Sequence, residues 1–116
     1  MTHVKTSCSA TAPEHDIRLE GDIDLASQPE LEAAVTMFVE CAHRDVCVDA
    51  ASLDFIDSTG LTFLVHVARL SRQRGGGVRV TGAPRQLARM VEVTALPIEM
   101  DPDPDSSCGA PVGGRA

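Results

Sequence analysis

The feature that most constrains the fold is a short turn that joins a strand-like segment to a long apolar helix. The strand-like segment ends at Leu53-Asp54-Phe55-Ile56, and the turn Asp57-Ser58-Thr59-Gly60 opens a helix expected to run to about Arg74. The apolar residues that cover most of this helix are Leu61, Phe63, Leu64, Val65, Val67, Ala68 and Leu70. Such a helix packs against a sheet and a neighbouring helix, and only a narrow strip of its surface stays exposed to solvent.

The polar residues of that helix share one arc, which consists of Thr62, His66, Arg69 and Gln73. At ~100° per residue, Ser58 projects near the same strip, so its hydroxyl should be accessible to another protein. Free backbone N–H groups and the helix dipole favour negative charge at a helix N-terminus. We therefore predict that Ser58 is a phosphorylation switch on a binding surface.

A capping role is the competing interpretation of Ser58, because Ser and Asp are common at helix starts for capping reasons alone. Asp57 can serve as the cap instead, which would leave the Ser58 hydroxyl free. Gly60 is expected to keep the turn uncrowded, so that a second protein surface approaches closely. Thr59 offers a neighbouring hydroxyl, and of the two we favour Ser58 as the modified residue.

Strands and helices alternate along the rest of the chain. Strands are expected at 17–24, 46–48 and 78–81, with a possible closing strand at 96–100, and weak alternation at Val4, Thr6 and Cys8 permits a short edge strand. A first helix is expected from Ser27 to about His43, with Ser27, Pro29 and Glu30 as its start signals. Its buried stripe would be Leu31, Val35, Phe38 and Ala42, and a last helix after Pro84 would bury Leu87, Met90 and Val91. This order predicts a mostly parallel sheet with helices packed on it.

Size and charge narrow the function. The 116 residues suit one domain, expected at 17–100 between a poorly patterned segment at 1–16 and a disordered acidic, Pro- and Gly-rich tail at 101–116. The net charge of −7 and the absence of Trp and Tyr disfavour nucleic acid, and the acidity disfavours an anionic membrane surface. Because we find no bilayer-spanning run and no signal core, we expect a cytoplasmic protein.

Cysteine spacing gives no clear site. Cys8, Cys41, Cys47 and Cys108 are scattered, and they form neither a disulfide framework nor a paired zinc motif. Cys41, His43 and Cys47 are close in sequence and suggest a metal site, but we expect thiols tucked against a helix end and a core strand. No metal and no cofactor are expected.

Catalysis is not expected either. Ser58 and His66 are eight residues apart, which on one helix separates them by ~12 Å, beyond the reach of a nucleophile and its base. The chain lacks a Gly-x-Ser-x-Gly elbow, and Gly75-Gly76-Gly77 follows a helix, the reverse of the order in a nucleotide loop. Asp22 and Asp24 could form a carboxylate metal site, but an acidic rim for a basic partner is the preferred interpretation.

Three stretches of this chain resemble the STAS domain in its stand-alone bacterial form, the anti-anti-sigma factors. They are residues 17–24 with the helix that follows, residues 53–61, and residues 76–80 with the Pro-initiated helix, which together span about residues 17–100. The middle stretch is the most specific. The resemblance implies an α/β fold, a STAS-like mixed four- or five-stranded sheet with helices packed mainly on one face.

The resemblance also implies a function. An anti-sigma factor antagonist of this kind binds an anti-sigma factor that is also a serine kinase, is released when the serine after the motif aspartate is phosphorylated, and is reset by a PP2C-type phosphatase. That serine falls on Ser58, and the acidic residue that closes the early strand falls on Asp24. The expected partner-binding residues are Asp24, Asp57, Ser58, Thr59, Gly60, Thr62, His66 and Arg69.

Two other functions stay open. The first is a STAS scaffold subunit of a larger signalling or lipid-transport assembly, in which Ser58 is never phosphorylated. The second, more distant, is a small hydrolase. The pattern is compatible with a monomer or a weak dimer, and it identifies neither the sigma factor nor the particular kinase and phosphatase.

Overall fold

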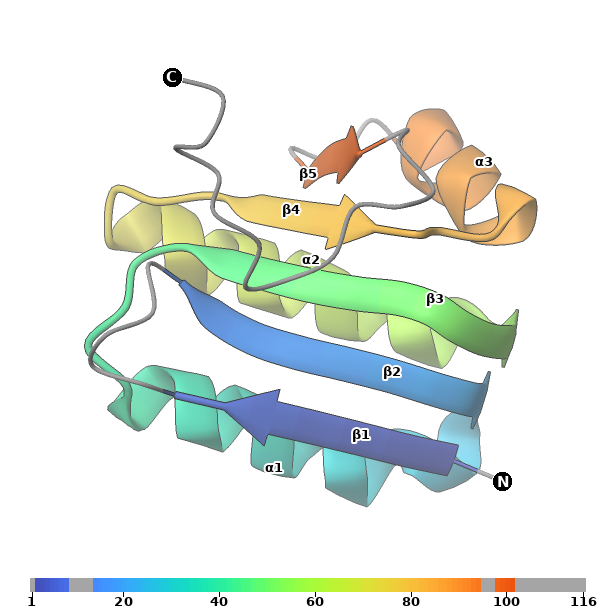
Figure 1. Cartoon of the computed structure of the whole chain (residues 1–116), viewed down its shortest axis with the longest axis horizontal. Helices are drawn as coiled ribbons and strands as arrows, with labels where there is room; N and C mark the ends of the chain where they lie inside the picture. The colour runs from blue at the N-terminus through green and yellow to red at the C-terminus, as the bar shows by residue number, and fades with distance from the viewer. Residues whose placement is uncertain (1, 9–13, 95–97, 102–116) are drawn as a thin grey trace.

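The computed structural model describes residues 2–8, 14–94 and 98–101, and Figure 1 shows their arrangement. The strands are β1 (Thr2–Ser7), β2 (His15–Ile23), β3 (Val46–Ile56), β4 (Val78–Thr81) and β5 (Ile98–Asp101). The helices are the 3₁₀ turn η1 (Leu25–Ser27), α1 (Gln28–Glu40), α2 (Ser58–Gln73) and α3 (Arg85–Thr94). The alternation predicted from the sequence is confirmed, including an edge strand before Ala10.

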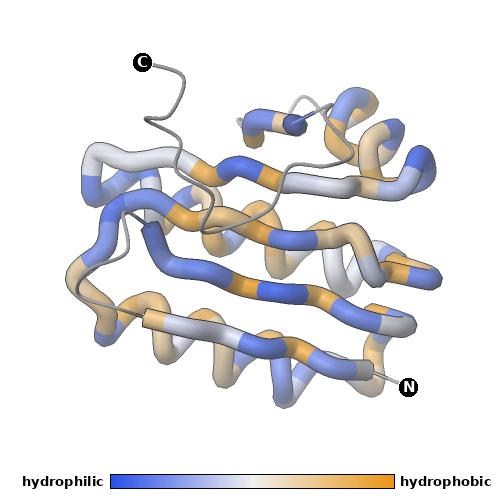
Figure 2. The backbone as a smooth tube through the Cα atoms, viewed as in Figure 1, coloured by the Kyte–Doolittle hydropathy of each residue, from blue (hydrophilic) through white to orange (hydrophobic). Residues whose placement is uncertain are grey.

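The strands form one mixed five-stranded sheet in the order β1-β2-β3-β4-β5. β1 is antiparallel to β2, and the other neighbours are parallel, as in the pairs Ile23–Ile56 and Val46–Val78. Each parallel crossover carries a helix, which is the connection that adjacent parallel strands require. Figure 2 shows hydrophobic and hydrophilic residues alternating along β2, as expected for a strand with differing faces.

Helices α1 and α2 cover the same face of the sheet (Figure 1). The core between them and the sheet is mostly aliphatic: Ile17, Leu19, Val48 and Leu64 are fully buried, and Phe38 is the largest of the fully buried side chains. This arrangement confirms the expected α/β fold with helices mainly on one face. No helix in the described part of the chain is long and apolar enough to cross a membrane.

The start of α1 differs from the prediction. Ser27 makes no side-chain capping bond to α1, so the expected capping box of Ser27 and Glu30 is wrong. Ser27 instead belongs to η1, whose own capping box joins it to Asp24: the Asp24 N–H donates to the Ser27 hydroxyl, and the Asp24 carboxylate accepts from the Ala26 N–H at 3.0 Å. The side chain of Ser27 is thus engaged in the 3₁₀ turn that precedes α1.

The end of α1 also differs, because the helix stops at Glu40 and not near His43. Ala42 therefore lies outside the helix and is exposed, and Ala34 takes its place in the buried stripe. The guanidinium of Arg74 satisfies this end of the helix: it donates to the carbonyl oxygens of Phe38, Val39, Cys41 and His43 at 2.6–3.0 Å.

Other boundaries shift at strand ends. β3 continues without a break from Val46 to Ile56, so the two strand-like stretches of the sequence are one strand. β5 includes Asp101, which the sequence placed in the tail, while Leu96 and residues 102–116 lie outside the described residues. Leu87 and Val91 of α3 are buried as expected, and Met90 is partly buried.

Candidate functional site

The site predicted around Ser58 lies where β3 ends and α2 begins. Asp57 lies between the two elements: its N–H donates to the carbonyl of Ile23, the last residue of β2, at 3.1 Å, and its carboxylate accepts from the Thr59 N–H of α2 at 2.8 Å. Asp57 is thus the N-cap of α2, as the sequence suggested. Ser58 is the first residue of the helix and is exposed, so its hydroxyl is accessible and the cap does not depend on it.

Asp24 reaches the same edge of the sheet from the neighbouring strand. β2 and β3 are parallel, and their last residues, Ile23 and Ile56, are paired. Asp24 and Asp57 follow these residues directly, so both carboxylates leave the sheet at one edge, beside the start of α2. The two residues also have the same structural role: Asp24 is the N-cap of η1, and Asp57 is the N-cap of α2.

Gly60 requires a correction. It is buried, and a Cβ placed on it would lie 2.4 Å from Cγ1 of Ile56 and 3.0 Å from Cγ2 of Ile23. Its missing side chain therefore lets α2 pack closely on the sheet, and it does not leave the turn open to a partner as expected. Gly60 shapes the site from beneath.

A groove of about 540 Å³ runs between α1 with η1 on one side and α2 on the other. Thr59, Thr62 and His66 of the predicted site line its α2 side, together with Phe63. Leu25, Gln28, Leu31, Glu32, Val35 and Thr36 line the other side. Thr62, His66 and Arg69 are exposed, as the helical periodicity predicted, but Arg69 is not part of the groove lining.

Leu25 is the residue of this surface that sequence reasoning missed. It is 70% exposed in η1, directly after Asp24, and it forms part of the groove wall. Large apolar side chains exposed beside a groove are typical of binding surfaces. The sequence did contain a signal: Leu25 is apolar and lies after the strand and before the helix. Neither the alternation of the strand nor the periodicity of the helix requires an apolar residue there.

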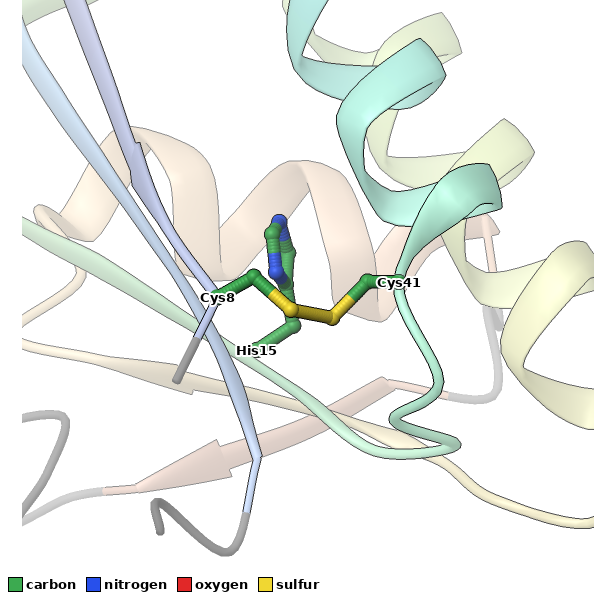
Figure 3. A group of neighbouring side chains, drawn as sticks. All are labelled: Cys8, His15 and Cys41. Carbon is green, nitrogen blue, oxygen red and sulfur yellow. A yellow bond between two sulfur atoms is a disulfide. The ribbon is translucent and has the colours of Figure 1, made fainter. Parts of the chain in front are cut away.

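The cysteines also differ from the prediction. Cys8 and Cys41, expected as separate thiols, form a disulfide with 6.4 Å between their Cα atoms (Figure 3). Cys47, expected as a thiol against a core strand, is disulfide-bonded as well. Cys8 directly follows β1, which pairs antiparallel with β2, and it contacts Cys41 at the end of α1, 33 positions away in the sequence, a contact that the sequence pattern does not reveal. His15 lies with this pair, whereas the sequence had grouped Cys41 with His43 and Cys47.

The hydrolase alternative gains no support from the geometry. Ser58 and His66 belong to one continuous helix, α2, so the ~12 Å separation expected from helix rise holds. His66 lies on the groove wall, whereas Ser58 begins the helix at the edge of the sheet. Ser58 and His66 are therefore not placed as a nucleophile and its base.

Comparisons with known proteins agree with this architecture. The sequence model of the family described as "Mlab, STAS domain" matches residues 8–98. An anti-sigma-B factor antagonist of Staphylococcus aureus (strain NCTC 8325 / PS 47) is 27% identical over 82 residues, which cover 71% of this chain and 76% of that protein.

Solved structures share the fold. The anti-sigma factor antagonist SpoIIAA in its unphosphorylated form superposes with a TM-score of 0.70 at 16% identity, over 89% of this chain and 90% of that chain. The Bacillus cell fate determinant SpoIIAA in its phosphorylated form superposes with a TM-score of 0.61 at 15% identity, over 89% and 93%. At these identities the likeness concerns the fold.

Proposed function

The chain belongs to the STAS domain family, and we propose that it is an anti-sigma factor antagonist switched off by phosphorylation of Ser58. Its curated relatives carry the antagonist name, and the family is regulatory rather than catalytic. The partner would be an anti-sigma factor that is also a serine kinase, and a PP2C-type phosphatase would reset the switch. We place this exchange in the cytoplasm.

The observation that carries the proposal is that Asp57 and Ser58 have different roles at the start of α2. Asp57 caps α2 through the Thr59 N–H, and the Ser58 side chain is exposed at the same helix start. A kinase can therefore modify Ser58 without removing the cap. Because the helix N-terminus tolerates negative charge, the fold should survive the modification.

Phosphorylation would act on the partner through charge and bulk. A phosphate adds about −1.5 to −2 charges, next to the carboxylate of Asp57 and at the same sheet edge as Asp24. A protein surface packed over this turn would have to accommodate that charge and its hydration. A loss of ~3 kcal/mol of binding free energy would weaken the affinity more than a hundredfold.

The proposed partner surface combines the acidic edge and the groove. The residues in it are Asp24, Asp57, Ser58, Thr59, Thr62, His66 and Arg69, to which we add Leu25. Gly60 contributes only by setting how closely α2 lies on the sheet. The SpoIIAA neighbours, solved in unphosphorylated and phosphorylated forms, support the idea that this fold tolerates both states.

The test is phosphorylation by the cognate kinase with ATP, followed by mass spectrometry. We expect one phosphate on the wild type and on Thr59→Val, and none on Ser58→Ala. Equal phosphorylation of Ser58→Ala would reject the site. We also expect Ser58→Asp to fold normally and to bind the kinase weakly, and an unchanged affinity would reject the interface.

One observation favours a second candidate: the matching family model is described by the name Mlab, not as an antagonist. In that case the chain would be a scaffold subunit of a larger signalling or lipid-transport assembly, with Ser58 unmodified. Stable copurification with non-kinase subunits and no phosphate on Ser58 in cells would identify this function.

A further inference from the structure

A group of three potential metal ligands lies at the end of the sheet where β1 ends and β2 begins. Cys8 follows β1, His15 is the first residue of β2, and Cys41 is the C-cap of α1. The two sulfur atoms and a ring nitrogen of His15 all lie within 4.8 Å of one another. Figure 3 shows the His15 ring beside the sulfurs of Cys8 and Cys41.

His15 is an unusual core residue. Its side chain is fully buried, and in the part of the chain that the structure describes neither ring nitrogen has a hydrogen-bond partner. Burying polar atoms without partners costs free energy, and native structures rarely leave them so. The ring contacts Phe38 with 5.4 Å between centroids, a packing role that an apolar ring would fill without that cost.

The three side chains match the donor chemistry of zinc. Two cysteine sulfurs and an imidazole nitrogen are soft to borderline donors, which suit zinc and do not suit Mg²⁺ or Ca²⁺. Cys8 is exposed, so a metal ion could enter from that side.

We propose that, once the Cys8–Cys41 disulfide is reduced, Cys8, Cys41 and His15 together bind one Zn²⁺. A dithiol reductant supplies two electrons and two protons to break the S–S bond, and becomes a disulfide itself. The ion then forms two Zn–S bonds and one Zn–N bond and displaces the two thiol protons to solvent, while water takes a fourth position. Tetrahedral zinc holds two sulfurs about 3.8 Å apart, so the disulfide and the metal are mutually exclusive.

Reducing conditions would favour the metal form. Disulfides are rare in cytosolic proteins because the thiol pool keeps cysteines reduced. The site needs little rearrangement on reduction, because Arg74 holds the carbonyl of Cys41 and β-pairing with Asp16 holds Ser7, the residue before Cys8. The inference does not rest on the phosphorylation of Ser58, since the two sites use different residues.

The test is zinc binding to the full chain, reduced with a phosphine and titrated with Zn²⁺ in a chelator-buffered series. We expect one Zn²⁺ per chain, and a thiolate charge-transfer band when Co²⁺ replaces zinc. The variants His15→Phe and Cys41→Ser should bind at least about tenfold more weakly, since even outer-shell partners are worth that much. His3→Gln, a histidine exposed on β1, is the matched control and should bind as the wild type does.

A second measurement needs no variant and so does not depend on folding of a mutant. Zinc should protect Cys8 and Cys41 from alkylation in the reduced wild type, with the sites mapped by peptide mass spectrometry. Absence of zinc binding to the reduced wild type, protection of other cysteines instead, or unchanged affinity in folded His15→Phe would each overturn the proposal.

Discussion

The carboxylate of Asp57 accepts a 2.8 Å hydrogen bond from the backbone N–H of Thr59, across the exposed Ser58 between them. This bond assigns the capping of α2 to the aspartate. The serine hydroxyl is thereby available for modification at a position where the helix dipole favours an anion. Under the proposed function, stability would therefore depend on Asp57 and regulation on the adjacent Ser58.

Asp57→Ala should therefore destabilise the protein, and Ser58→Ala should not. Loss of an N-cap costs about 1 kcal/mol, whereas an exposed substitution away from such features stays within about 0.5 kcal/mol. Urea unfolding followed by circular dichroism measures both variants under one condition. A larger loss of unfolding free energy for Ser58→Ala than for Asp57→Ala would show that the serine, not the aspartate, carries the cap.

Gly60→Ala should destabilise the junction of α2 with the sheet. The new Cβ would meet Cγ1 of Ile56 at 2.4 Å and Cδ1 at 2.6 Å, and overpacking of this kind costs about 1–3 kcal/mol. The double variant Gly60→Ala with Ile56→Val removes one of the clashing atoms and should recover part of the loss. Gly77→Ala, where an added Cβ meets nothing within 4 Å, is the control for adding a methyl group.

Arg74→Lys should also destabilise the fold, although it keeps the charge. The Arg74 guanidinium donates to four backbone carbonyls at and just beyond the end of α1, and it lies 4.6 Å over the ring of Phe38. A lysine ammonium lacks the planar fork that makes these bonds together. We expect a loss of about 1.5–3 kcal/mol in thermal or urea unfolding, while Arg72→Lys on the exposed side of the same helix leaves stability unchanged.

These residues also show what sequence reasoning could and could not reach. The exposed strip of Thr62, His66 and Arg69 and the cap at Asp57 were predictable, because helix periodicity and capping are local. The bonds from Arg74 to the end of α1, and the contact of Cys8 with Cys41, join residues more than 30 positions apart. Such contacts depend on how β1 and the helices pack, which no local pattern contains.

Leu25 was not predicted for a different reason: it lies between a strand and a helix, outside both periodic patterns. It also gives the sharpest test of the proposed partner surface. It is 70% exposed, so Leu25→Ser should leave the free energy of unfolding nearly unchanged. At the wall of the groove, however, an apolar anchor contributes about 1–2 kcal/mol to binding, so affinity for the kinase should fall about five- to thirtyfold. Val93→Ser on α3 is the matched control, because Val93 is 80% exposed and does not line the groove. Calorimetric titration of the unphosphorylated protein with the kinase compares the two variants, and equal affinities would place the docking surface elsewhere.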